Sequence, residues 1–418
     1  MSALRICHIA PGFVPFGRGA YAVNNIIMEL ASRFVKCGHE VIAINVSESS
    51  KGNQRVRYEG GVEIFEVPVW DFLPNKNSKS QSMIKEVTYS VKLSRFLEDF
   101  INECDIIHFH VPFPLMLSLE KIVKKGVPLV YTIHNPNIGI KAKGRNLFEL
   151  ARELNVLKMP RYANFLSLYA IQLGLEYSSA VIAISKILKS NIIEYFGIRA
   201  EKVFYIPNGV NTQRFKPGNY PEVRNLFRIP EDYYIVLNVA RIAPYKNQLA
   251  IVKAIPWILE ETAEVMFVFV GPYDKNSDYK QKIDYFIRKN NLESHVIFTG
   301  KISSDLLPKV YASADIFVFP SISEGMPMAL LEALSSGNAI VASDIPQNRE
   351  ISITGREAIY VNPQNIQEIA ESIIILIEDK KLQEKMKKRG RKTAVEHFDW
   401  DIISRKVMKV YEEVVGGE

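Results

Sequence analysis

The sequence predicts an α/β protein with two Rossmann-like domains, each built on a parallel β-sheet that helices cover on both faces. The chain has 418 residues, of which 47% are hydrophobic and 23% are charged. This composition excludes a disordered or collagen-like chain and supplies enough apolar material for two cores. Short runs rich in Val, Ile and Phe alternate with amphipathic stretches along the whole chain. Such apolar strands with intervening helices are typical of parallel sheets.

The expected strands form two series, and amphipathic stretches such as 22–37 and 83–102 separate several of them. The first series occupies residues 4–10, 41–46, 62–69, 106–111, 129–134, 180–185 and 203–206. The second occupies residues 234–240, 266–271, 296–300, 316–320, 339–343 and 359–362. Each series is long enough for one Rossmann-like sheet.

Turn-forming residues interrupt the pattern between the two series, in the runs Pro207-Asn-Gly-Val210 and Pro217-Gly218. We therefore expect one domain over residues 1–206 and a second over residues 207–399. Apolar side chains at helical spacing predict a final helix from about residue 400 to residue 415.

The net charge of +6 is concentrated in the first half of the chain. Residues 1–200 carry 24 Lys and Arg against 17 Asp and Glu, and the basic residues are densest over 141–161. A basic stretch can bind nucleic acid, anionic lipid or a phosphorylated ligand. Charge patterning alone favours an ordinary solvated helix face.

The N-terminus has no pattern of a secretory signal, and no apolar run approaches the ~18 residues of a membrane-spanning helix. The cysteines Cys7, Cys37 and Cys104 match no disulfide or zinc motif. We therefore expect a cytoplasmic protein without metal or cofactor. His108 and His110 alternate on one strand face, where packed or cleft-lining histidines are favoured over a metal pair.

The segment Phe319–Gly337 is the most informative in the chain. A strand ends near Pro320, a Gly/Pro loop follows, and a helix is expected from about Pro327 to Ser336. Glu332 follows Glu324 by eight positions, which is up to ~12 Å along a helix axis. Free amides at a helix start favour a diphosphate, and a carboxylate accepts hydrogen bonds from vicinal hydroxyls. The candidate amide donors are those of Gly325, Met326, Met328 and Ala329.

A second element supports a diphosphate site. The expected strand 234–240 leads to Arg241, and Lys246 follows five residues later. An Arg and a Lys at a strand-to-helix turn can bind two phosphates and stabilise a departing diphosphate. Taken alone, these residues could equally be surface charges.

These motifs resemble those of glycosyltransferase family 4 and cover nearly the whole chain in the family's order. They are Gly38-His-Glu-Val41, Tyr131-Thr-Ile-His134, Ile206-Pro-Asn-Gly-Val210, the Arg241 to Lys246 turn, and Glu324-x7-Glu332 within Ser323-Glu-Gly-Met-Pro-Met-Ala-Leu-Leu-Glu-Ala333. The resemblance implies the GT-B fold, with two domains facing each other across a cleft. It implies that residues 1–206, joined by a crossover helix at 400–418, bind the acceptor and that residues 207–399 bind a nucleotide-sugar. It also implies transfer with retention of configuration and without a required metal.

The resemblance also assigns roles to individual residues. Glu332 would hold the donor ribose, while Arg241 and Lys246 would hold the diphosphate. Glu324 and the amides after it would orient the transferred sugar, and His134 would lie near the anomeric carbon. The remaining donor contacts would come from Lys301 near the base and from the first loop, through Gly17 and Gly19. In that loop Arg18 separates the two glycines, which are usually adjacent in the family.

The leading hypothesis is a retaining hexosyltransferase. Its donor would be a UDP-sugar, with GDP-mannose as the second choice. The acceptor would be a glycan, a glycolipid or a polyprenol-linked saccharide. One alternative is a protein that uses the basic first half to bind nucleic acid or an anionic membrane. Another is a nucleotide-sugar epimerase of the same fold. A dinucleotide oxidoreductase is weakly supported, because no strand is followed by G-x-G-x-x-G. We expect no nucleic-acid partner, and a peripheral contact of residues 141–161 with the inner membrane face.

Overall fold

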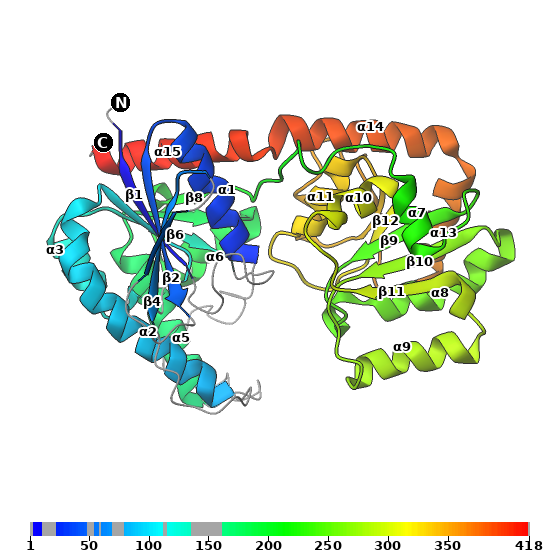
Figure 1. The fold of residues 1–418 in the computed structure, drawn as a ribbon, viewed down its shortest axis with the longest axis horizontal. Coiled ribbons are helices and arrows are strands. Elements are labelled where there is room, and N and C mark those ends of the chain that lie inside the picture. Colours follow the sequence, from blue (N-terminus) through cyan, green and yellow to red (C-terminus); the bar gives the residue numbers. More distant parts are fainter. Residues whose placement is uncertain are drawn as a thin grey trace. The chain divides into compact units, whose positions relative to one another are not determined.

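The computed structural model describes residues 3–10, 22–47, 54–57, 60–68, 79–111, 115–134 and 161–416 (Figure 1). The chain divides into two compact units, which we call unit 1 (residues 1–207 and 403–418) and unit 2 (residues 208–402). The glycines of the first loop, Gly17 and Gly19, and the basic residues 141–160 lie outside the described residues. The expectations about them therefore remain sequence-based.

Unit 1 contains an eight-stranded sheet in the order β3-β4-β2-β1-β5-β6-β7-β8. Seven strands run parallel, as the apolar runs predict. The strands are β1 (Arg5–Ile9), β2 (Glu40–Ser47), β3 (Gln54–Arg57), β4 (Glu63–Pro68), β5 (Ile106–Phe109), β6 (Leu129–Ile133), β7 (Ala180–Ala183) and β8 (Val203–Tyr205). The helices are α1 (Ala22–Lys36), α2 (Lys79–Phe100), α3 (Leu119–Lys124), α5 (Arg161–Tyr177), α6 (Lys186–Phe196) and the main part of α15 (Trp400–Gly416).

The edge strand β3 was not expected from the sequence, and it pairs antiparallel with β4. Its residues Gln-Arg-Val-Arg contain a single apolar side chain, so they give none of the apolar signal of the other strands. An edge strand bonds on one side only and can remain polar, which explains why the apolar pattern did not reveal it.

Unit 2 contains a six-stranded parallel sheet in the order β11-β10-β9-β12-β13-β14. The strands are β9 (Tyr234–Val239), β10 (Val265–Val270), β11 (Val296–Gly300), β12 (Ile316–Phe319), β13 (Ala339–Ser343) and β14 (Ile359–Val361). The helices are α7 (Pro221–Phe227), α8 (Gln248–Glu261), α9 (Asp278–Lys289), α10 (Leu306–Ser313), α11 (Met328–Ser336), α12 (Pro346–Arg349), α13 (Ile366–Glu378) and α14 (Lys380–His397). All six predicted strands are therefore confirmed.

Helices cover both faces of the sheet in unit 2. In Figure 1, α8 and α9 lie below the sheet and α10 and α11 lie above it. Buried side chains of α8, α13 and the central strands form one continuous core. The predicted punctuation of α11 is confirmed: Pro327 precedes its first residue, and Gly337 ends it with a φ of 75°. That left-handed conformation suits glycine, which has no Cβ.

The C-terminal helix α15 begins in unit 2 and belongs to unit 1 from Ile403 onward. Its Tyr411 is fully buried in unit 1, where its hydroxyl lies 2.5 Å from Nδ1 of His108 on β5. Among the described residues, no helix is long and apolar enough to cross a membrane.

Candidate functional site

The candidate residues of unit 2 follow the carboxyl ends of its strands, two of them central and one at the sheet edge. Arg241 comes after β9, Lys301 after β11 and Glu324 after β12. The strand order reverses between β9 and β12, and ligands of open α/β sheets bind at such a switch point. The loops after these two strands are joined directly, since the backbone N–H of Ile322 donates to the carbonyl of Tyr245 over 2.8 Å.

Lys246 and Glu324 form an ion pair at this switch point, with Nζ 2.5 Å from Oε1. Their side chains are only 15% and 9% exposed. The ammonium also lies 5.2 Å from the centre of the Phe319 ring. Burial of both groups and the loss of solvent screening strengthen this pair relative to a surface ion pair. The structure thus brings together two residues that are 78 positions apart in the sequence.

Arg241 and Lys301 are both exposed. They follow β9 and β11, and Gly271 follows β10, the strand between these two. The Gly271 N–H donates to the carbonyl of Gly300 over 3.0 Å. A Cβ on Gly271 would lie 2.1 Å from the backbone oxygen of Ala240, so only glycine allows this close approach. Gly271 therefore sets the spacing between the segments that carry Arg241 and Lys301, a role that the sequence did not reveal.

The start of α11 presents the four amides named from the sequence. Within the described part of the chain, the N–H groups of Gly325, Met326, Met328 and Ala329 have no hydrogen-bond acceptor. Free N–H groups and the positive end of the helix dipole favour an anion. The loop is held in place by Met326, whose sulfur accepts a hydrogen bond from the backbone N–H of Asn208 over 3.2 Å. This contact joins the Pro-Asn-Gly turn to the loop before α11.

Glu332 is half-buried on α11 and accepts a hydrogen bond of 2.8 Å from the hydroxyl of Tyr311 on α10. Burial raises the pKa of Glu332 to about 7, while the Tyr311 hydrogen bond and the charge of Arg214 act in the opposite direction. A carboxyl group with this pKa changes its charge near neutral pH. Tyr311 and Arg214 were not named from the sequence, because they are far from Glu332 along the chain and belong to no local motif.

The remaining candidate, His134, lies in unit 1 directly after β6 and is half-buried. Its Nε2 lies 3.0 Å from Nδ1 of His110. Burial lowers the pKa of His134 to about 4, so the ring is neutral at physiological pH. The sequence interpretation of His108 and His110 as packed histidines agrees with their exposures of 0% and 2%.

Two families match consecutive parts of the chain. The family described as Glycosyltransferase Family 4 matches residues 23–214, and that described as Glycosyl transferases group 1 matches residues 219–393. The chain belongs to the GT-B glycosyltransferases of the family 4 type. The resemblance seen in its motifs is therefore confirmed, and so is the enzyme class.

Relatives of this glycosyltransferase align along most of its length. An uncharacterized glycosyltransferase of Methanocaldococcus jannaschii is 27% identical over 392 residues, which cover 92% of each chain. The UDP-Gal:alpha-D-GlcNAc-diphosphoundecaprenol alpha-1,3-galactosyltransferase of Escherichia coli is 25% identical over 341 residues, 80% of this chain and 81% of that protein. The crystal structure of HepE from Anabaena in complex with UDP-glucose superposes with a TM-score of 0.72 and 18% identity, over 98% of this chain and 100% of that one. This last similarity establishes the fold alone.

Proposed function

We propose that this glycosyltransferase moves a hexose from a nucleotide-diphospho-sugar, preferentially a UDP-sugar, to a hydroxyl group of a glycan or lipid-linked saccharide. The observation that carries the proposal is the Lys246–Glu324 ion pair beside the open amides of α11, at the switch point of the unit 2 sheet. A cation and a helix start suit the diphosphate, and the two carboxylates suit the sugar rings on either side. The E. coli relative, whose name includes UDP-Gal and a diphosphoundecaprenol acceptor, supports the same classes of substrate.

In the proposed reaction, the bond between the anomeric carbon and the diphosphate oxygen breaks as the acceptor oxygen bonds to that carbon. Lys246, Arg241 and the α11 amides would stabilise the negative charge that develops on the leaving diphosphate. The acceptor would approach on the face from which the diphosphate leaves, which retains the anomeric configuration. A donor phosphate oxygen would take the acceptor proton. Because protein cations and amides balance the diphosphate charge, we propose that no metal is required.

The test is a donor panel of UDP- and GDP-sugars, screened first by thermal shift and then by release of UDP or GDP in the presence of acceptors. A ligand that binds the native state raises the melting temperature by mass action. We expect UDP-hexoses to give the largest shift and NMR of the product to show a retained anomer. An inverted product, or a shift with GDP-mannose only, would contradict the corresponding part of the proposal.

The raised pKa of Glu332 predicts that donor affinity depends on pH. Between pH 6 and pH 8 the carboxyl group loses its proton, and only the carboxylate accepts hydrogen bonds from both ribose hydroxyls. We therefore expect the Kd of the best nucleotide-sugar, measured by calorimetry, to fall as the pH rises through 7. Glu332→Gln should raise the Kd at pH 8 by about 10- to 100-fold and remove most of the pH dependence. A wild-type Kd that is constant over this range would contradict the assignment.

We also propose that the basic residues 141–161 dock the enzyme on an anionic lipid surface that carries its acceptor. The proposal is supported by the clustering of six Lys and Arg residues in this stretch and by the lipid-linked acceptor in the name of the E. coli relative. We expect co-sedimentation with liposomes that contain anionic lipid, and its loss at high salt. Absence of charge-dependent sedimentation would rule out this docking.

A further inference from the structure

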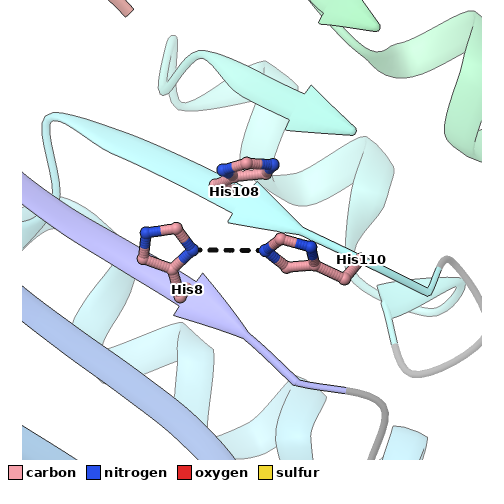
Figure 2. A group of neighbouring side chains, drawn as sticks. All are labelled: His8, His108 and His110. Atoms are coloured by element: carbon pink, nitrogen blue, oxygen red, sulfur yellow. Dashed lines mark hydrogen bonds between the residues drawn. The ribbon is translucent and has the colours of Figure 1, made fainter. Parts of the chain in front are cut away.

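Unit 1 contains a cluster of histidines. Only one of them, His134, has been given a role so far. His8 lies on β1, His108 on β5 and His110 directly after β5, all at the carboxyl ends of their strands (Figure 2). The strand order of this sheet reverses between β1 and β5, so the cluster occupies the switch point of unit 1. All three side chains are at most 2% exposed.

Three of the histidines form a chain of hydrogen bonds that ends at His134. Nδ1 of His8 lies 3.3 Å from Nε2 of His110, the contact drawn as a dashed line in Figure 2. Nδ1 of His110 lies 3.0 Å from Nε2 of His134. His110 thus uses both of its ring nitrogens and connects a fully buried histidine to a half-buried one.

The direction of this chain determines which nitrogen of His134 carries a proton. Burial keeps His8, His110 and His134 neutral, and a neutral imidazole has one N–H donor and one acceptor nitrogen. If His110 donates to His134, it must accept from His8. If His110 instead accepts from His134, it must donate to His8. The two directions therefore leave His134 with its proton on Nδ1 or on Nε2.

The unpaired nitrogen of His8 distinguishes between the two directions. Nε2 of His8 is buried and has no hydrogen-bond partner within the described part of the chain. A buried N–H without an acceptor is rarer in proteins than a buried acceptor without a donor. His8 should therefore hold its proton on Nδ1 and donate to His110, which in turn donates from Nδ1 to His134.

We propose that His110, supported by His8, is a positioning residue that holds His134 as the Nδ1–H tautomer. His134 then offers an N–H donor, rather than a basic nitrogen, to a substrate hydroxyl. This last step rests on the proposed function, while the tautomer itself does not. Free imidazole side chains favour the Nε2–H tautomer. The hydrogen bonds from His8 through His110 therefore hold His134 in the less common tautomer.

The same cluster has the composition of a metal site, but its ring geometry does not fit one. Ligand atoms of His8, His108 and His110 all lie within 4.8 Å of one another. However, the rings of His108 and His110 are stacked, with centroids 4.3 Å apart and planes inclined by 25°. Nitrogen lone pairs lie in the ring plane, so two stacked rings do not converge on one ion. Both nitrogens of His108 are also engaged, by Tyr411 and by Thr132 at 2.5 and 2.7 Å.

The test combines nitrogen-15 NMR of the histidine rings in the full-length protein with donor-turnover kinetics. His110→Phe removes the donor to His134, His110→Asn retains an amide donor near the position of Nδ1, and His108→Phe is the packing control. His108 is equally buried and stacks on His110, but its two ring nitrogens bond to Tyr411 and Thr132 and not to His134. We expect His134 to be protonated on Nδ1 in the wild type, in His110→Asn and in His108→Phe. In His110→Phe we expect the Nε2–H form and a fall in kcat of about tenfold, the effect of one hydrogen bond.

Several results would overturn the inference. They are an Nε2–H form of His134 in the wild type, an unchanged tautomer in His110→Phe, or a tautomer change of equal size in His108→Phe. A loss of melting temperature on chelation by EDTA that zinc restores, with shifts of the His8 and His110 signals, would instead establish a metal site. A wild-type protein with the Nδ1–H form that transfers no sugar would support the tautomer and contradict the proposed function.

Discussion

Lys246→Ala is expected to lower kcat/KM for the nucleotide-sugar by about 100- to 1,000-fold, the usual effect of removing one stabilising group from a developing anion. The substitution has two consequences. It removes the buried cation of the site, and it leaves the carboxylate of Glu324 without its partner at 2.5 Å. The leaving diphosphate would then face an unbalanced negative charge. The measurement is the initial rate of UDP or GDP release, with melting temperatures recorded in parallel.

Two further variants separate a loss of charge at the site from a general loss of charge. Lys253→Ala removes an exposed lysine from α8 of the same unit and should leave kcat/KM unchanged. Glu324→Gln keeps the shape of the side chain but leaves the buried ammonium of Lys246 without its charged partner, so we expect a large loss of rate together with a lower melting temperature. Full transfer rates in both Lys246→Ala and Glu324→Gln would refute the site assignment.

Glu357→Gln is expected to lower the free energy of unfolding by roughly 3 kcal/mol at pH 7, because the pKa of this carboxyl group falls from the ordinary 4.5 to about 2 and one pKa unit corresponds to about 1.4 kcal/mol. The carboxylate of Glu357 is 1% exposed in the loop before β14. Burial alone would raise its pKa, but hydrogen bonds to the charged form prevail and lower the pKa to about 2. The donors are the hydroxyls of Ser352 and Thr393 and the backbone N–H groups of Ile353, Thr354 and Arg356.

The pH dependence of this effect has a definite sign. Because the folded-state pKa lies below the ordinary value of 4.5, the stabilisation is complete above pH 4.5 and is lost as the pH falls towards 2. The difference in stability between the wild type and Glu357→Gln should therefore shrink between pH 5 and pH 3 in urea unfolding followed by circular dichroism. Glu378→Gln removes the same charge from an exposed position of α13 and serves as the control. An equal loss of stability in both variants would show that the hydrogen bonds around Glu357 are not responsible.

The periodicity of the chain determined most of the fold because its strands are buried on both faces. Runs such as Val265–Val270 are apolar at every position, and every residue of this strand is buried. Strand β3 lacked this signal because it lies at the sheet edge. The helix α11 could be delimited to within one residue, because Pro327 and Gly337 mark its two ends.

The sequence by itself determined the parallel strands of the two sheets, the helix of the Glu-x7-Glu segment and the charged residues beside that helix. The tertiary structure alone decided which side chains from distant parts of the sequence contact one another. Lys246 contacts Glu324 over 78 positions, Tyr311 contacts Glu332 over 21, and His8 contacts His110 over 102. The physical reason is the parallel sheet, in which each crossover returns the chain to the same edge and places strand ends side by side in an order that no local pattern records.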